Sequence, residues 1–330
     1  MKITVLGAGA WGTALAQLLC DGKNNVTLWG HDAAHLGDLK KNRRNERYLQ
    51  GIELSLDLKF ETDLTRAVFD PELVAELVVV AVPSRGFREI SESLAGFTGT
   101  IVSVTKGIEH ETGLTMCGVL TQTAPKAKWA ALSGPSLAFE VARGIPTAIV
   151  AASEDPATAG AVQKLFHRPA FRVYTSHDLT GVEFGGALKN VIAIAAGVCD
   201  GLGFGDNSKA ALVTRGLAEI RRLGVAGGAQ ADTFSGLSGL GDLMVTCFSK
   251  LSRNRGFGER LGRGENVEAI LAGTKSVAEG FPTARSAFEL ARKLGIETPI
   301  IDQIYAALYQ GKNPALALRD LTTRESRPEN

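Results

Sequence analysis

The sequence has 330 residues, of which 45% are hydrophobic and 22% are charged, and its formal net charge is +1. This length suggests two domains of ordinary size, and the composition is that of a folded chain and not of a disordered one. A net charge near zero gives no general attraction to nucleic acid or to membranes. We therefore expect no nucleic-acid partner, and any positive field that attracts a ligand has to be local.

The N-terminal residues and the cysteines favour a cytoplasmic protein. One lysine is followed directly by a strand-like run, without the charged leader and long apolar stretch of a secretory signal. No apolar stretch reaches the ~20 residues that cross a bilayer, so we expect no membrane span. The four cysteines stand far apart and favour buried, reduced thiols: Cys20, Cys117, Cys199 and Cys247. His31 and His35 have a spacing that suits a metal, but no third ligand is evident nearby, and we predict no metal site.

The first half of the chain alternates strand-like and helix-like segments. Short apolar runs predict strands at residues 3–6, 26–29, 77–82, 100–104, 129–132, 148–152 and 171–174. Helix-like segments lie between them at residues 13–20, 86–94, 114–121 and 156–166. Several runs are nearly continuous in Val, Ile or Leu, which is typical of strands covered on both faces. The alternation predicts an α/β fold with a mostly parallel, doubly wound, Rossmann-like sheet.

After residue 177 the pattern changes to helices alone. They are predicted at residues 182–200, 208–223, 237–248, 267–272, 283–294 and 299–309. Four glycines stand where helices would end and suit left-handed C-cap positions: Gly224, Gly273, Gly295 and Gly311. We predict a dinucleotide-binding domain over residues 1–177 and an all-α substrate domain over residues 178–330. The polar segment 322–330 is expected to be frayed.

Three glycines after the first strand form a G-x-G-x-x-G motif, in which Gly7, Gly9 and Gly12 enclose Ala10 and Trp11. The motif follows a strand and opens a helix, which is the context that dinucleotide binding requires. Gly7 permits the tight turn, Gly9 lets the pyrophosphate approach the backbone, and Gly12 lets helix and strand pack closely. The helix N-terminus then offers free N–H groups to the phosphates. A glycine-rich turn without a ligand is the alternative.

The end of the second strand is expected to face the adenosine ribose of such a cofactor. Asp32 could hydrogen-bond the ribose 2′-hydroxyl of NAD, whereas His31 could meet the 2′-phosphate of NADP, and no arginine is adjacent in the sequence. A solvated loop histidine is an equally good interpretation of His31. The sequence leaves the choice open and slightly favours NADP.

Polar residues also follow two later strands. Lys106 comes directly after one strand, and Gly134 and Ser136 come after the next. In an open α/β sheet, ligands collect at the carboxyl ends of the strands, so these residues are candidates for a substrate site. A surface lysine and an ordinary strand–helix turn would look the same in isolation.

The predicted helix over residues 182–200 is apolar nearly all round, and Lys189 and Asn190 lie in its middle. Burial of an ammonium without partners is costly, so Lys189 has to reach a polar cleft, a carboxylate or, by snorkelling, the solvent. Asp242 offers a carboxylate inside another apolar stretch, either as the partner of Lys189 or only as a helix N-cap. Ser252, Arg253 and Asn254 group at an apparent helix start, which suits a phosphate, although a solvated basic loop is the alternative.

The chain resembles the bacterial-type NAD(P)-dependent glycerol-3-phosphate dehydrogenases along essentially its whole length. The strings that carry the resemblance, in order, are GAGAWGTALA, LWGHD, TKGIE, SGPSLAFEV, EFGGALKNVIAIAAG, LSGLGDL, SRNRGFG and VAEG. The resemblance implies a soluble oxidoreductase that transfers hydride between NAD(P)H and dihydroxyacetone phosphate. The product, sn-glycerol 3-phosphate, would serve glycerophospholipid synthesis.

The resemblance also implies roles for individual residues. Lys189 is the implied catalytic acid/base. The implied substrate site comprises Lys106, Gly134, Ser136, Lys189, Asn190, Asp242, Ser252, Arg253 and Asn254. The dinucleotide is implied to touch Trp11, His31, Lys106, Ala138, Arg253, Val277 and Glu279, beside the glycine loop. Ala10 replaces the serine and His31 replaces the arginine that many relatives carry.

Two other functions remain as alternatives at this point. The first is a β-hydroxyacid dehydrogenase of similar architecture, against which the basic cluster at Ser252–Arg255 argues. The second is a non-catalytic dinucleotide sensor, in which Lys189 and Asn190 would have little purpose. The sequence is compatible with a homodimer but contains no feature that argues for one.

Overall fold

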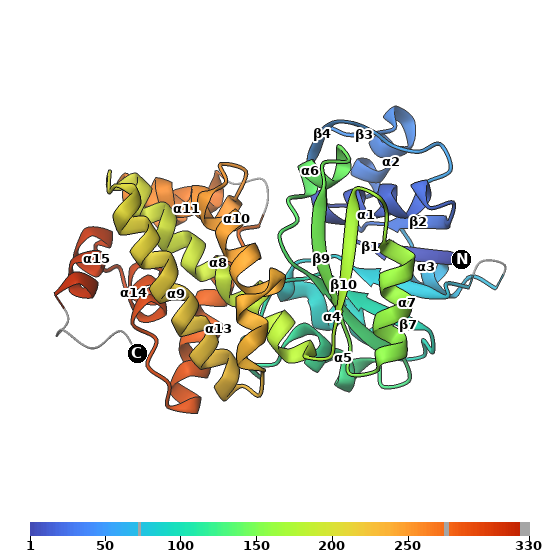
Figure 1. Cartoon of the computed structure of the whole chain (residues 1–330). Coiled ribbons are helices and arrows are strands. Elements are labelled where there is room, and N and C mark those ends of the chain that lie inside the picture. Colours follow the sequence, from blue (N-terminus) through green and yellow to red (C-terminus); the bar gives the residue numbers. More distant parts are fainter. Residues whose placement is uncertain (72–73, 274–276, 324–330) are drawn as a thin grey trace.

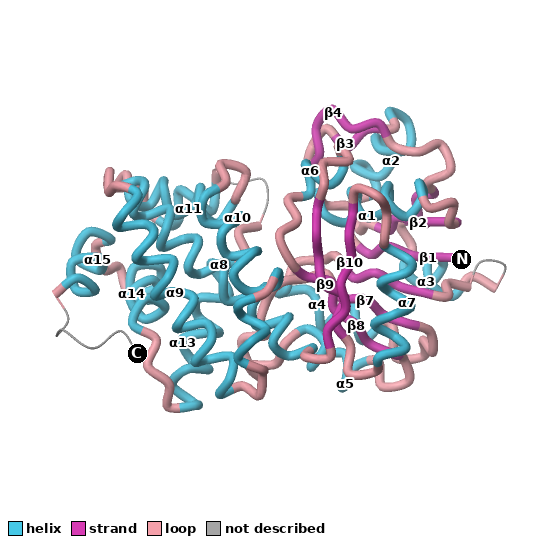
Figure 2. Tube along the Cα trace, in the orientation of Figure 1, coloured by secondary structure: helices cyan, strands magenta, loops and turns pink. Residues whose placement is uncertain are grey.

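The computed structural model describes residues 1–71, 74–273 and 277–323. Figure 1 shows two halves side by side, a sheet with its helices on the right and a bundle of helices on the left. In Figure 2 the strands of the described chain are confined to the first half. The boundary between the two kinds of structure follows from the sequence pattern, because the short strand-like runs end where the long helical segments begin.

The first half contains an eight-stranded sheet in the order β10-β9-β8-β7-β6-β1-β2-β5. Neighbouring strands are parallel except for β8 and β9, which are antiparallel. The strands are β1 (Lys2–Leu6), β2 (Asn25–Trp29), β5 (Lys59–Glu61), β6 (Leu77–Val80), β7 (Thr100–Ser103), β8 (Lys128–Ser133), β9 (Thr147–Ala152) and β10 (Phe171–Ser176). The seven predicted strands and the mostly parallel sheet are confirmed. Three further strands, β5 and the small ladder of β3 (Arg44–Asn45) and β4 (Leu49–Glu53), were not predicted, because they have no continuous apolar run.

Helices cover both faces of this sheet. They are α1 (Ala10–Asp21), α2 (Ala33–Asn42), α3 (Leu64–Phe69), η1 (Ser84–Gly86), α4 (Phe87–Glu92), α5 (Met116–Thr123), α6 (Ala138–Ala142) and α7 (Pro156–Phe166). Successive strand residues point to opposite faces, so Val5 packs with Leu15 of α1 while Leu6 packs in a second core with Phe87 of α4. The central strands of the sheet are therefore buried on both sides, as their apolar residues predict, whereas the edge strands β5 and β10 are partly exposed.

The second half is built around α8 (Leu179–Gly201), which packs against most of its other helices. These are α9 (Asp206–Ala226), α10 (Asp242–Phe248), α11 (Arg253–Gly262), α12 (Val267–Ala272), α13 (Gly280–Leu294), α14 (Pro299–Tyr309) and α15 (Pro314–Thr322), with short turns η2 (Ala231–Ser235) and η3 (Leu237–Gly241). The single helix predicted over residues 237–248 is wrong in one respect, because its first part is the π-helical turn η3. The predicted frayed tail falls mostly outside the described residues, and Thr322 ends α15.

With 23 residues, α8 is long and apolar enough to cross a bilayer, which corrects the expectation that no stretch reaches that length. Its most apolar window is, however, entirely buried inside the protein. The other helices thus take the place that lipid would occupy, and the composition of α8 is explained by its position in the core of the helical half.

The predicted glycine C-caps are confirmed only in part. Gly295 ends α13 with φ +67°, and Gly311 has the same φ just beyond α14. Gly224 instead lies inside α9, where an added Cβ would come within 2.2 Å of the Phe234 ring, so close packing and not a cap requires glycine there. Gly273 caps α12 with φ −83°, which any residue can adopt.

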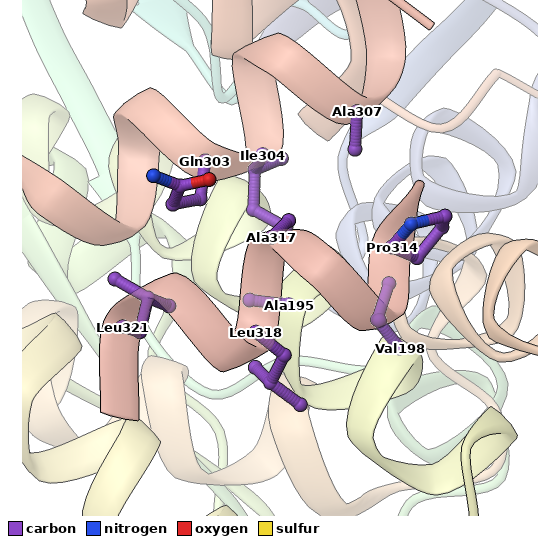
Figure 3. Close-up of a pocket in the computed structure, with 9 residues that line it drawn as sticks. All are labelled: Ala195, Val198, Gln303, Ile304, Ala307, Pro314, Ala317, Leu318 and Leu321. Atoms are coloured by element: carbon purple, nitrogen blue, oxygen red, sulfur yellow. The ribbon is translucent and has the colours of Figure 1, made fainter. Parts of the chain in front are cut away.

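A small apolar cavity lies where α15 covers α8 and α14 (Figure 3). It is lined by Ala195, Val198, Gln303, Ile304, Ala307, Pro314, Ala317, Leu318 and Leu321. Nearly all of these side chains are apolar, so the cavity is a packing defect in the bundle and offers little to a polar substrate.

Two glycines let the backbones of α8 and α11 touch. A Cβ on Gly197 would lie 2.0 Å from the carbonyl oxygen of Arg255, and a Cβ on Gly258 would lie 2.0 Å from that of Ile194. Both distances are far below van der Waals contact with a backbone that cannot easily move. The approach of α11 to the middle of α8 therefore depends on these glycines.

We expect Gly197→Ala to lower the free energy of unfolding by about 2 kcal/mol or more, because the new methyl group forces the two helices apart. Denaturant unfolding at neutral pH measures the change. Gly256→Ala is the matched control, since Gly256 lies in α11 with no heavy atom within 4 Å of the position of a Cβ. It should leave stability unchanged or raise it by about 0.5–1 kcal/mol. Equal effects of the two variants would contradict the close approach of the helices.

Candidate active site

The glycine loop joins β1 to α1 in the geometry that its sequence predicts. Gly7 has φ +118°, and a Cβ there would lie 2.6 Å from the carbonyl oxygen of Ala81. A Cβ on Gly12 would lie 1.9 Å from the oxygen of Gly7, so only glycine lets α1 begin so close to the strand. Around Gly9, by contrast, no heavy atom lies within 4 Å of the Cβ position, which leaves room for a ligand to approach the backbone.

The other residues expected at the dinucleotide lie around this loop or on the helical half. Ala10 and Trp11 begin α1, and the indole nitrogen of Trp11 is buried without a hydrogen-bond partner. Ala138 begins α6, which packs against α1. His31 is exposed just beyond β2. Within the described parts of the chain, no group of three or more His, Cys, Asp or Glu side chains is placed to hold a metal ion.

The carboxyl ends of β7 and β8 meet, as expected for neighbouring parallel strands. Lys106, which follows β7, donates a hydrogen bond from Nζ to the carbonyl oxygen of Gly134 at 3.0 Å. Gly134 follows β8 with φ +141°, and its carbonyl oxygen also accepts a hydrogen bond from the Ser136 hydroxyl at 2.9 Å. The three residues selected at these two strand ends therefore form one cluster.

Asp242 joins this cluster to the helical half. Its Oδ2 lies 2.6 Å from Nζ of Lys106, and its Oδ1 lies 2.6 Å from Nζ of Lys189 on α8. The Asp242 side chain is almost fully buried, and Lys189 is 6% exposed. The snorkelling alternative for Lys189 is therefore wrong. Asp242 is the first residue of α10, and its carboxylate binds the two lysines instead of acting only as a cap.

The ammonium of Lys189 has one further partner that the sequence analysis missed. Its Nζ donates to Oγ1 of Thr246 at 2.5 Å. Thr246 lies four residues after Asp242, so both side chains project from the same face of α10. This i, i+4 spacing is the signal that could have identified Thr246 once Asp242 was selected.

Burial lowers the pKa of Lys189 to about 8, well below the usual range of a lysine. The carboxylate of Asp242 raises this pKa, whereas the second ammonium, on Lys106, lowers it. The balance places the titration of Lys189 close to neutrality, where a group can both give and take a proton.

A second set of polar contacts links α8 to α11. Nδ2 of Asn254 donates to Oδ1 of Asn190 at 2.8 Å, and Oδ1 of Asn254 accepts from the backbone N–H of Gly280 at 2.9 Å. Ser252 is the N-cap of α11 and accepts from the N–H of Arg255. Arg253, the first residue of the helix, is exposed. The predicted helix start at this basic cluster is confirmed.

Glu279 forms another contact between the halves. Its carboxylate accepts hydrogen bonds from the backbone N–H of Ser84 at 3.0 Å and from the Ser84 hydroxyl at 2.5 Å. Burial raises the pKa of Glu279, and the positive charge of Arg253 lowers it, so the two side chains are near enough to interact. Val277 is partly buried two residues earlier. No local pattern points to Ser84, because its partner is 195 residues away along the chain.

We expect Asp242→Asn to lower the free energy of unfolding by about 3 kcal/mol, because it leaves buried ammonium groups uncompensated. It should also lower the pKa of Lys189 further. Between this lowered pKa and the usual pKa of a lysine, Lys189 is protonated in the unfolded variant but not in the folded one. The free energy of unfolding of the variant therefore rises with pH across this range. The loss of stability relative to the unaltered chain is thus larger at pH 6 than at pH 9.

Denaturant unfolding at the two pH values measures both effects. Asp320→Asn is the control, since Asp320 forms an exposed ion pair with Lys312, and its change should stay within about 0.5 kcal/mol. An Asp242→Asn protein as stable as the unaltered chain at pH 6 would contradict the buried arrangement.

Comparison with known proteins identifies the family. The family models described as NAD-dependent glycerol-3-phosphate dehydrogenase N-terminus and C-terminus match residues 2–159 and 178–319. A glycerol-3-phosphate dehydrogenase [NAD(P)+] of Anaeromyxobacter dehalogenans is 50% identical, with 100% of both chains covered. Another, of Citrifermentans bemidjiense, is 47% identical, with 99% of this chain and 98% of the relative covered.

A solved structure agrees with these sequence relatives. The crystal structure of a glycerol-3-phosphate dehydrogenase of Coxiella burnetii has a TM-score of 0.93 and 36% identity, with 98% of each chain covered. Both halves described above, and the interface between them, therefore have counterparts in a single known architecture. The chain belongs to the NAD-dependent glycerol-3-phosphate dehydrogenase family.

Proposed function

We propose that this chain interconverts dihydroxyacetone phosphate and sn-glycerol 3-phosphate with NAD(P)(H), and that Lys189 is its acid/base. The observation that carries the proposal is the cluster in which the partly buried Lys106 and the buried Lys189 share the buried carboxylate of Asp242, which joins the glycine-loop half to the helical half. Family membership supports the reaction, and the names of the relatives include both NAD and NADP. In this role the chain would supply glycerophospholipid synthesis.

The glycine loop suits a dinucleotide, because the open space at Gly9 lies next to the unpaired N–H groups of the first turn of α1. When bound, the reduced nicotinamide would supply hydride to the ketone carbon of the substrate. The residues that would hold the cofactor are Gly7, Gly9, Ala10, Trp11, Gly12, His31, Lys106, Ala138, Arg253, Val277 and Glu279. In this proposal residues 1–177 form the cofactor domain and residues 178–330 the substrate domain, with the sheet ending at Ser176 and α8 beginning at Leu179.

Negative charge develops on the carbonyl oxygen of the substrate during reduction. Lys189, as an ammonium, would stabilise this charge and donate its Nζ proton to the oxygen, and Lys106 would hold the same oxygen or the neighbouring hydroxyl. Asp242 and Thr246 keep Nζ of Lys189 in place. In the oxidative direction the neutral amine of Lys189 would take the proton back.

The phosphate of the substrate would bind at the N-terminus of α11. Arg253 is exposed there, and Ser252 and Asn254 flank it. The remaining members of the proposed substrate site are Gly134, Ser136 and Asn190. Gly134 and Ser136 lie beside Lys106, and Asn190 is hydrogen-bonded to Asn254 of α11. Among the residues proposed to bind the substrate, three cations, Lys106, Lys189 and Arg253, against one anion, Asp242, leave a charge of +2, which matches the charge of about −1.5 to −2 on a phosphate monoester.

Family membership argues against the β-hydroxyacid dehydrogenase alternative, and the paired, buried ammonium of Lys189 favours an enzyme over a non-catalytic sensor.

The four cysteines are unpaired, which supports the proposed cytoplasmic location. The slight preference for NADP depends on His31 alone, and we keep both dinucleotides in the proposal. A homodimer stays a prediction.

We expect Lys189→Met to reduce kcat by ~10³-fold or more while leaving the affinity for NADH unchanged, because only the proton donor and its charge are lost. In the unaltered enzyme, kcat for reduction should fall as pH rises above about 8, since the ammonium of Lys189 deprotonates there. Lys209→Met is the matched control, because Lys209 is also buried and paired, with Asp200 at 2.8 Å. A Lys189→Met enzyme with near-normal kcat would refute the assigned role.

Arg253→Gln should mainly raise KM for dihydroxyacetone phosphate, by about tenfold or more, because a charge-assisted hydrogen bond to the phosphate is lost. Initial rates over a range of substrate concentrations measure the change. Arg260→Gln, also on α11 and paired with Glu265 at 2.6 Å, should leave KM unchanged. If Arg253→Gln also left KM unchanged, Arg253 would not bind the phosphate.

A further inference from the structure

An ion pair lies just beyond the end of β2, next to His31 and apart from the lysine cluster. Oδ2 of Asp32 is 3.0 Å from Nη1 of Arg47, and both side chains are accessible to solvent. Oδ1 of Asp32 accepts the N–H of His35 at 3.0 Å and so caps α2. The sequence analysis found no arginine beside Asp32, because Arg47 is 15 residues further along the chain.

The segment that carries Arg47 is anchored to the back of the glycine loop. Nδ2 of the fully buried Asn45 donates to the carbonyl oxygen of Ala8 at 3.1 Å and to Oγ1 of Thr13 at 2.7 Å. Oδ1 of Asn45 accepts the N–H of Tyr48 at 3.2 Å. Arg47 lies between these two residues, so its backbone has a fixed position relative to the loop, and its guanidinium lies over the Tyr48 ring.

Asp32 has an equally fixed position relative to the glycine loop. β1 and β2 are parallel neighbours, and the N–H of Gly7 donates to the carbonyl oxygen of Trp29 at 2.9 Å. A dinucleotide whose pyrophosphate lies at the N-terminus of α1 extends its adenosine ribose toward the end of the second strand. The ion pair therefore stands where the ribose 2′ position would lie.

We propose that the Asp32–Arg47 pair sets the choice between NAD and NADP. Asp32 accepts hydrogen bonds from the ribose hydroxyls of NAD, and Arg47 binds the 2′-phosphate of NADP. This rests on the proposed function, which requires a nicotinamide dinucleotide in the glycine loop. Only Nη1 of Arg47 contacts Asp32, and a guanidinium has further donors that suit a phosphate. An exposed pair of this kind is weak, so Arg47 can turn to a phosphate at little cost.

The Asp32 carboxylate stays beside the site in either case. It is held by the N–H of His35 at the N-terminus of α2, so it cannot withdraw when Arg47 leaves it. Its charge repels a 2′-phosphate but attracts hydroxyl donors. The unaltered chain should therefore bind NADH more tightly than NADPH, which reverses the slight preference for NADP drawn from His31, while Arg47 keeps NADPH usable.

Calorimetric titration of the full chain with NADH and with NADPH tests the proposal without any need for turnover. Arg47→Gln should raise Kd for NADPH by about tenfold and leave Kd for NADH within about twofold. Asp32→Asn should do the opposite, tightening NADPH by about tenfold and weakening NADH. Asparagine is also a good N-cap, so α2 should remain intact.

Arg292→Gln is the matched control, because Arg292 forms an exposed ion pair with Asp302 at 2.9 Å on the helical half, and it should alter neither Kd. Equal changes in both Kd values in either test variant would overturn the proposal, and so would tighter binding of NADPH than NADH by the unaltered chain. A chain that bound neither dinucleotide would overturn the proposed function as well, and the two failures are thus distinguishable.

Discussion

One buried carboxylate, that of Asp242, binds two ammonium groups that come from opposite halves of the molecule. Lys106 follows a strand of the sheet, whereas Lys189 lies in the central helix of the bundle. Neither of the two buried charges, those of Lys189 and Asp242, could be buried alone at acceptable cost, and Lys106 is partly buried beside them. Their mutual contact therefore fixes how the end of the sheet meets the helical half, and it leaves an excess of positive charge where the halves join.

The close packing of α8 and α11 sets the position of polar residues next to the Asp242 cluster. Because Gly197 and Gly258 let α8 and α11 touch, Asn254 on α11 reaches Asn190 on α8 directly. Asn190 is the neighbour of Lys189, so the exposed Arg253 at the start of α11 has a set position relative to the buried ammonium. The spacing between a phosphate site and a proton donor is thus determined by backbone contact, which is stiffer than contact through long side chains.

Most of the fold could be predicted from the sequence, because the central strands are buried on both faces and stand out as short, mostly apolar runs. The strand β5 and the β3–β4 ladder have no such runs, and their pairing depends on partners far along the chain. Gly224 shows the same limit, since its requirement for glycine comes from the ring of Phe234 and not from a helix end. A sequence pattern identifies a glycine at a given position but does not show which distant side chain packs against it.

Some residues of the site could be predicted from the sequence, and others could not. Lys189 and Asp242 could be selected because each interrupts an apolar stretch, and Thr246 could have followed from its i, i+4 spacing. Arg47 and Ser84 could not, because their partners, Asp32 and Glu279, are brought to them only by the fold. Arg47 lies in a turn and Ser84 begins the short η1, so neither interrupts an apolar run that would mark it in the sequence.

The proposed reaction depends most on a positively charged site that suits a phosphorylated ketone. The direct measurement is the initial rate of NADH oxidation by the unaltered chain with dihydroxyacetone phosphate, compared with unphosphorylated dihydroxyacetone under the same conditions. We expect kcat/KM to be at least about a hundredfold higher for the phosphorylated ketone, since its dianion pairs with the excess cations. Comparable rates with both ketones, or none with either, would contradict the account.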